Sequence, residues 1–100
     1  MTRYIKSDYN QYVPANTASQ ALHNGSGKVR AIIATATSGT SGALTLYDNT
    51  AASGNVLIKV NVTNGHPAII ILPANYPLVF TNGLTAASSA NVEAFVLTEA

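Results

Sequence analysis

The residues of segment 55–62 alternate with a period of two, and this pattern constrains the fold more than any other feature of the chain. Val56, Ile58, Val60 and Val62 fall on one side of an extended backbone, with Asn, Leu, Lys and Asn on the other. Such alternation, with β-branched residues on one side, predicts a half-buried strand. We therefore expect the four β-branched residues to face a core.

Further segments carry similar signals, and turn residues separate nearly all of them. Strong strand candidates are residues 29–37, 43–48, 68–72, 78–81 and 92–98, and weaker ones are 18–24 and 85–88. Asn24-Gly25 and Asn64-Gly65 suit tight hairpins. Because no stretch of a dozen residues has helical periodicity, the pattern predicts an all-β chain folded as a single antiparallel β-sandwich or jelly-roll-like domain.

Several side chains have an expected place in this sandwich. Leu44 and Leu46 should face inward, and Phe80 and Phe95 should lie in the core. Segment 29–37 is apolar or small on both sides, so it should lie centrally in a sheet or be covered on both faces. Residues 68–72, Ala-Ile-Ile-Ile-Leu, would favour aggregation at an open edge. We expect them to be buried in the core or in a subunit interface.

The first 17 residues lack clean alternation and hold three of the five tyrosines. We divide the chain into an extended N-terminal arm, residues 1–17, and a β-sandwich domain, residues 18–100. The arm either reaches a neighbouring molecule or packs on its own domain as a first strand. Tyrosine favours contact, because it is enriched at interfaces. The candidate partner-binding residues are Arg3, Tyr4, Lys6, Tyr9 and Tyr12.

Charged residues are scarce, which excludes several classes of partner. The chain has five Lys and Arg, four Asp and Glu and a net charge of +1, 9% charged residues in all, against roughly 25% in an average soluble domain. Five scattered cations form no basic stripe, so we expect no nucleic-acid partner. No apolar stretch approaches the roughly 20 residues of a membrane helix, and the first residues lack the apolar core of a signal peptide.

Catalytic and metal-binding patterns are also weak. Cysteine is absent, which excludes disulfides and thiolate chemistry. His23, His66 and Asp48 could meet around a metal, but their spacing does not support it, and exposed turn histidines are the simpler interpretation. No serine lies in a G-x-S-x-G elbow, and the four acids are scattered. Asp48 and Asn49 are expected to bond their own downstream amides. We expect neither an enzyme nor a cofactor.

Three stretches, residues 27–36, 41–58 and 77–85, resemble the small β-sandwich virion proteins of tailed bacteriophages. The most specific parts are residues 44–54, Leu-Thr-Leu-Tyr-Asp-Asn-Thr-Ala-Ala-Ser-Gly, and residues 80–85, Phe-Thr-Asn-Gly-Leu-Thr. The resemblance covers about residues 25–98. It implies architectural roles for these residues: Tyr47 and Asp48 would end a strand and fix a turn, Gly54 would reverse the chain, and Asn82-Gly83 would supply positive φ.

The resemblance implies a structural role, first as a capsid decoration (cement) protein that binds the major capsid protein on the outside of the head. Such a protein would be made in the host cytoplasm and reside on the virion surface. We also expect self-association, with a trimer as the first choice. A tail, baseplate or head-fibre component is an alternative. A carbohydrate-binding module is a third class, and it would need an exposed aromatic platform, for which Tyr47 and Tyr76 remain.

Overall fold

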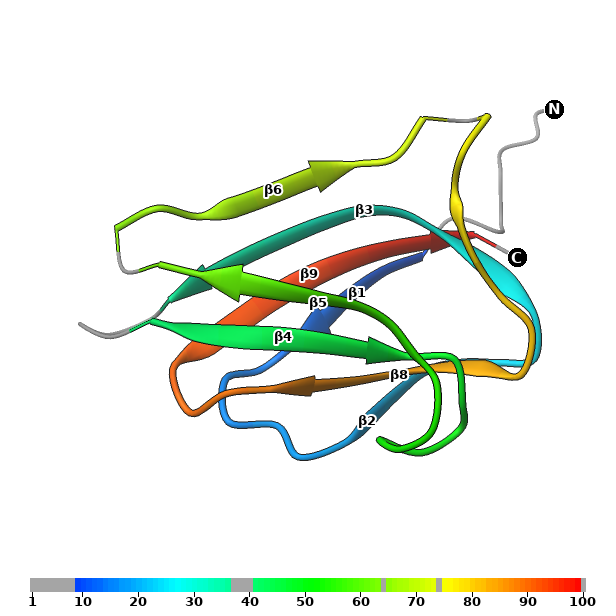
Figure 1. Ribbon diagram of the computed structural model, residues 1–100, viewed down its shortest axis with the longest axis horizontal. Helices are drawn as coiled ribbons and strands as arrows, with labels where there is room; N and C mark the ends of the chain where they lie inside the picture. Colours follow the sequence, from blue (N-terminus) through cyan, green and yellow to red (C-terminus); the bar gives the residue numbers. More distant parts are fainter. Residues whose placement is uncertain (1–8, 37–40, 64, 74, 100) are drawn as a thin grey trace, which may run out of the picture.

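The computed structural model describes residues 9–36, 41–63, 65–73 and 75–99, and their regular structure is entirely β (Figure 1). The strands are β1 (Tyr9–Val13), β2 (Gln20–Asn24), β3 (Gly27–Ala36), β4 (Gly42–Tyr47), β5 (Val56–Val62), β6 (Ala68–Ile71), β7 (Leu78–Phe80), β8 (Gly83–Ser88) and β9 (Val92–Glu99). The expected all-β class is confirmed. All the strong strand candidates, and both weaker ones, are strands within a few residues of the expected bounds.

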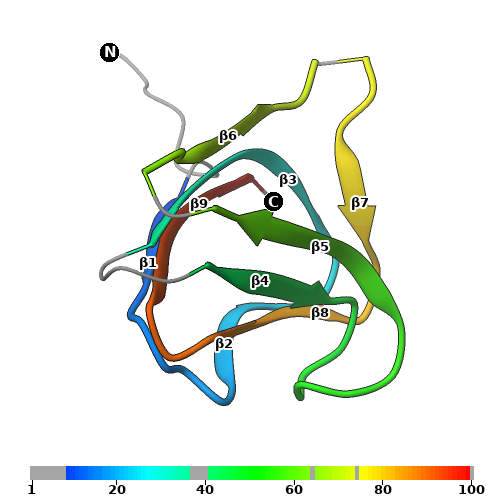
Figure 2. The same cartoon turned by 60° about the vertical axis from the view of Figure 1, so that its left-hand side comes forward.

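The strands form two antiparallel sheets packed as a sandwich (Figure 2). The five-stranded sheet has the order β1-β9-β3-β6, and β7 also pairs with β3. β6 and β7 share one side of β3, since β6 lies opposite residues 31–34 and β7 opposite residues 27–29. The four-stranded sheet has the order β2-β8-β4-β5. β3 is therefore central in its sheet, as its apolar character predicts.

The core lies between the two sheets and is built from alternate residues of their strands. Its largest fully buried side chains include Phe80, Ile32, Leu44, Leu46 and Leu84. Full burial of a side chain of this size contributes about 1.5–3 kcal/mol relative to exposure. The inward orientation predicted for Leu44 and Leu46 is confirmed, and so is the core position of Phe80.

Gly27 shows how closely β3 approaches this core. A Cβ atom at Gly27 would lie 2.7 Å from the tip of the Phe80 ring and 2.9 Å from the carbonyl oxygen of Glu99. Real Cβ contacts do not reach such distances, so the ring of Phe80 occupies the space that a side chain would need. The glycine at the start of β3 is thus required by packing.

Two expected core positions are wrong. Val60 and Val62 are buried, but Val56 is 54% exposed. Val56 is exposed because β5 is the edge strand of its sheet and because the β4–β5 register shifts between Leu46 and Tyr47, the residue with which Val56 pairs. Phe95 is 44% exposed. Its neighbours in β9, Ala94 and Val96, are the residues that face the core, so alternation turns Phe95 outward.

The N-terminal segment is in part a strand of the sandwich. Residues 9–13 form β1, which pairs with β9 from Tyr9 opposite Thr98 to Val13 opposite Ala94. Val13 is fully buried. Of the two interpretations of the arm, the described residues fit a first strand packed on its own domain. Residues 1–8 lie outside the described part of the chain.

Candidate interaction surface

The outward side of the five-stranded sheet carries a band of apolar side chains that crosses four strands. The register places Tyr12 beside Phe95, Phe95 beside Ile33, and Ile33 beside Ile69. A second row lies two residues further along each strand and runs from Leu97 through Ala31 to Ile71. We call this surface the outer apolar face, and its members are Tyr12, Ala31, Ile33, Ile69, Ile71, Phe95 and Leu97.

The outer apolar face is large for a chain of this size. Tyr12, Ile33 and Phe95 are each 44% exposed, Ile69 is 63% exposed and Ile71 is 76% exposed. Together they expose on the order of 500 Å² of contiguous apolar surface, near the upper end of what a monomeric protein leaves uncovered. Patches of this size on a monomer often have a binding function.

The face has a shape as well as a composition. The rings of Tyr12 and Phe95 lie with their centroids 5.1 Å apart and their planes at 42°. Ala31, Ile33, Phe95 and Leu97 line a hollow of about 230 Å³ beside these rings. The small side chain of Ala31 leaves this space between larger neighbours, so the face offers a socket for an apolar side chain of a partner.

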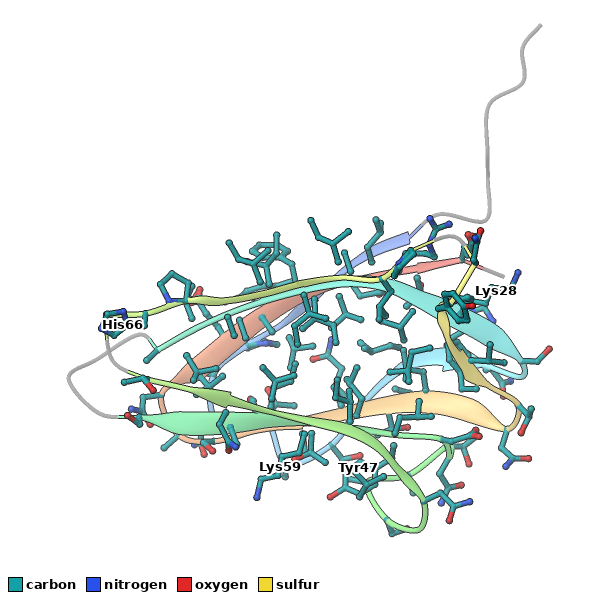
Figure 3. All side chains as sticks on the ribbon, turned by 45° about the horizontal axis from the view of Figure 1, so that its top comes forward. Lys28, Tyr47, Lys59 and His66 are labelled. Carbon is teal, nitrogen blue, oxygen red and sulfur yellow. The ribbon has the colours of Figure 1, made fainter. Side chains whose placement is uncertain are left out.

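Charged residues lie at the ends of the face and not in its middle. At one end, Arg30 and Glu99 form an ion pair with 2.7 Å between Nη1 and Oε2. At the other end, Glu93 lies opposite Thr35. In Figure 3 the side chains that project outward from the middle of this sheet are almost wholly carbon. An apolar centre with a polar rim is the usual anatomy of a protein interface.

The outward side of the four-stranded sheet differs. Lys59 and Tyr47 project from it, away from the core (Figure 3). A hollow of about 240 Å³ on this side is lined by a cation, hydroxyls and alanines, namely Ala43, Thr45, Lys59, Ala87, Ser88 and Ser89. The two outward sides of the sandwich are thus chemically distinct, and the five-stranded sheet bears the apolar one.

The predicted partner-binding residues meet this face at one point. Tyr12 belongs to it, and Tyr9 lies in β1 with its backbone opposite Thr98. Arg3, Tyr4 and Lys6 lie outside the described residues. The sequence interpretation missed Phe95 and Ile33 as contact residues, and it left a subunit interface open for residues 68–72, which include Ile69 and Ile71. One feature of the sequence could have indicated the outer apolar face. Segment 29–37 is apolar or small on both sides, whereas a strand with only its inner side buried needs apolar residues on that side alone.

The two histidines come from different parts of the sandwich, His23 from β2 and His66 from the β5–β6 connection. The His23 ring packs edge-on against Phe80, with centroids 5.3 Å apart, and its Nε2 lies 3.1 Å from the carbonyl oxygen of Ser26. His66 lies at the β5–β6 connection (Figure 3). Among the described residues, no three His, Cys, Asp or Glu side chains gather in metal-binding geometry.

Asp48 has a structural role that differs from the expected one. Its Oδ1 accepts hydrogen bonds from the backbone amides of Asn82 at 2.8 Å and Thr81 at 3.1 Å. The expected bond to an amide within the same connection is made by Asn49, whose Oδ1 accepts from Thr50 N at 2.8 Å. The bond from Asn82, followed by the bonds from Thr81, holds the pKa of Asp48 below its usual value.

The glycines of the same two segments have the backbone expected of them. Gly54 has a φ of 85° and Gly83 a φ of 153°, which favours glycine at both positions. A Cβ at Gly83 would also lie 3.1 Å from the carbonyl oxygen of Asn49. Residues 44–54 and 80–85, the most specific parts of the phage resemblance, therefore meet at one end of the sandwich as an architectural unit.

Comparison with known proteins adds little to this geometry. No family model matches the chain, and no curated protein matches it. Among solved structures, the virus-like particle of extra small virus from the giant freshwater prawn Macrobrachium rosenbergii shares 11% identity over 98% of this chain and 81% of the other, with a TM-score of 0.39. A TM-score this low carries no argument about fold or function. In the described part of the chain, no helix is long and apolar enough to cross a membrane.

Proposed function

We propose that the chain is a structural virion protein of the capsid decoration (cement) type. In this role it binds the outside of a phage head across junctions between major capsid proteins and stabilises the shell. The observation that carries the proposal is the outer apolar face, an uncovered contact surface on a chain whose chemistry-bearing side chains are few. The resemblance of residues 44–54 and 80–85 to small virion proteins supports the same role.

The size of the face sets the strength of a single attachment. A standard interface buries about 800 Å² on each partner, which is more than the roughly 500 Å² of the outer apolar face. Association itself costs an estimated 4–15 kcal/mol in lost translational and rotational freedom. One face on one site therefore binds weakly, and tight attachment to a shell needs either further contacts or several linked copies.

The charge distribution fits a covered surface. Segment 60–92 contains no Asp, Glu, Lys or Arg, and this segment includes β6, β7 and β8. Desolvating a charge without a partner is costly, and interface centres are accordingly depleted of charged residues. The absence of charged residues from this segment fits a sandwich whose outer side is covered by shell subunits and whose edge is covered by other copies.

A tail, baseplate or head-fibre component is the alternative structural role, and the same face would serve it. The two roles differ in where the copies lie on a particle. Electron microscopy of purified particles, with the chain located by gold-labelled antibody, tests the proposal. Copies distributed over the whole head support a decoration protein. Copies confined to one vertex or to the tail contradict it and support the alternative.

A carbohydrate-binding module is a weaker alternative. Tyr76 is 76% exposed, which supplies one aromatic surface for stacking. Sites for polar small molecules also need converging hydrogen-bonding groups, and the aromatic pair of the outer apolar face is flanked by isoleucine, alanine and leucine instead. Binding to a glycan array that is lost in Tyr76→Ala would favour this class over a virion protein.

A further inference from the structure

β6 pairs with β3 on one side and is the last strand of its sheet on the other. The backbone amide of Leu72 donates to the carbonyl oxygen of Arg30 at 2.8 Å, so the pair Arg30 and Leu72 is a hydrogen-bonded one. Hydrogen-bonded pairs alternate along an antiparallel ladder. Ile70 therefore bonds toward β3, and Ile69 and Ile71 turn their N–H and C=O groups to the open edge.

Between Pro67 and Pro73, this short edge lacks the charge, proline and bulge that usually protect one. Natural edge strands carry lysine, proline or a bulge that prevents pairing with another chain. Residues 68–72 hold neither a charge nor a proline, and their register against β3 runs without a shift. Ile69 and Ile71 also place exposed side chains on the outer apolar face beside the same edge. Both backbone and side chains are thus suited to accept another strand.

We propose that β6 pairs with β6 of a second copy of this chain, antiparallel about a two-fold axis, with Ile69 of each copy opposite Ile71 of the other. This inference rests on the proposed function: it describes how two copies of the decoration protein associate before they bind the shell. In this register the N–H of each Ile69 and Ile71 donates to the other copy, and the C=O of each accepts from it, which makes four hydrogen bonds in all.

Two prolines select this register. A slip of two residues in one direction sets Ile71 opposite Pro67, and a slip in the other direction sets Ile69 opposite Pro73. Proline has no N–H to donate, so each slip leaves an isoleucine carbonyl without a donor. A slip of one residue turns the isoleucine side chains to the wrong face. The strand is therefore self-complementary in one alignment.

The absence of charge favours a second copy over a different partner. In a two-fold contact each residue meets residues of the same segment, so a charged segment repels itself. Segment 60–92 is uncharged, which removes that repulsion and also removes the complementary charge that a different protein would recognise. The two-fold axis builds pairs, so this edge does not account for the trimer expected from the sequence.

The pair would also join the two outer apolar faces. A two-fold axis perpendicular to the sheet keeps both faces on the same side, with Ile69 of one copy beside Ile71 of the other. The joined surface is on the order of 1,000 Å², compared with about 800 Å² per partner in a standard interface. A pair could therefore bind two adjacent shell sites, which supplies the linked attachment that one copy lacks.

Single-cysteine crosslinking tests the register, because the native chain has no cysteine. Ile70 lies opposite Ile70 of the second copy in a non-hydrogen-bonded pair with Cα atoms about 4.5 Å apart, within the range a disulfide spans. Under mild oxidation we expect Ile70→Cys to form a disulfide-linked dimer at least tenfold faster than Val56→Cys on the edge strand β5. Comparable rates overturn the proposal, and so does fastest crosslinking by Ile33→Cys, which reports face-to-face packing.

A measurement on the unmodified chain guards against a cysteine variant that fails to fold. Hydrogen exchange followed residue by residue should slow at least tenfold at the Ile69 and Ile71 amides when protein concentration is raised from micromolar to millimolar. The Ile70 amide, already bonded to β3, should not change. Exchange at Ile69 and Ile71 that is independent of concentration overturns the pair. If the chain does not pair but still binds the shell, the pair is refuted and the decoration role is not. If the chain pairs but does not bind the shell, the decoration role is refuted and the pair is not.

Discussion

The carboxylate of Asp48 accepts a 2.8 Å hydrogen bond from the backbone amide of Asn82, 34 residues further along the chain. This bond joins the β4–β5 connection to the turn between β7 and β8. The amide of Asp48 itself donates to Asn55 at 2.9 Å, which closes its own connection. Asp48 thus takes part in two connections at the same end of the sandwich, through its backbone amide in one and its carboxylate to the other, and the charge of the carboxylate should govern how firmly the second is held.

Replacement of Asp48 by Asn should make stability less dependent on acid pH. The hydrogen bonds lower the pKa of Asp48 in the folded chain, while its unfolded value is about 3.9. The stabilisation is therefore present above the unfolded value and is lost as pH falls through the folded one. We expect Asp48→Asn to melt at a lower temperature than the native chain at pH 7, and the difference to shrink as the pH is lowered to 2. A difference unchanged between pH 7 and pH 2, or matched by the control Glu93→Gln, contradicts this role.

Truncation of an isoleucine should have very different effects on the two sides of the five-stranded sheet. Ile32 is fully buried and Ile71 is 76% exposed. We expect Ile32→Ala to lower the free energy of unfolding by about 2–5 kcal/mol and Ile71→Ala to change it by about 0.5 kcal/mol or less. Urea denaturation measures both. Equal losses would mean that Ile71 is covered within the monomer.

Gly27→Ala should destabilise the chain through the Phe80 ring. The new methyl group would have to share the space of a ring atom 2.7 Å away, and overpacking of this kind costs about 1–3 kcal/mol. The double variant Gly27→Ala with Phe80→Leu removes the clash with the ring and leaves the 2.9 Å approach to the carbonyl oxygen of Glu99, so its loss in urea denaturation should be smaller than the sum of the two single losses. Additive losses would place the strain elsewhere.

Deletion of residues 1–8 should remove most of the salt dependence of shell binding. This segment contains Arg3, Lys6 and Asp8, a third of the charged residues, and charge contacts at a protein surface are screened by salt. The deletion stops before β1, because Val13 is buried in the core. Binding to capsids at 50 and 500 mM NaCl measures the effect. Equal salt dependence in the native and shortened chains contradicts a charge contact by this segment.

Local pattern predicted the strands better than their surroundings. Alternation in segment 55–62 and in segment 92–98 is a property of neighbouring residues, so it is visible in the sequence. Strand β1 was left open as one of two alternatives for the arm, because residues 9–13 lack alternation and their pairing depends on β9, more than 80 residues away. A register shift between Val29 and Ala31 is likewise set by the partner strand.

The candidate site depended on the same long-range information. Phe95 belongs to the outer apolar face because Ala94 and Val96 face inward, and the period alone does not say which side of a largely apolar strand meets the core. The position of β6 at the sheet edge follows from the order of strands, which no local pattern contains. The sequence interpretation did leave a subunit interface open for residues 68–72. β6 lies at the edge of its sheet, so that expectation stays a prediction.

The most direct test of the central claim is the affinity of the chain for purified phage capsids, the partner that the proposed function requires, measured by cosedimentation with the native chain, Phe95→Gln and Lys59→Gln. Phe95 lies in the outer apolar face, and Lys59 projects from the opposite side of the sandwich. With both variants folded by circular dichroism, we predict at least a tenfold loss for Phe95→Gln and less than a twofold change for Lys59→Gln. Native affinity in Phe95→Gln, or a larger loss in Lys59→Gln, would contradict binding through the outer apolar face.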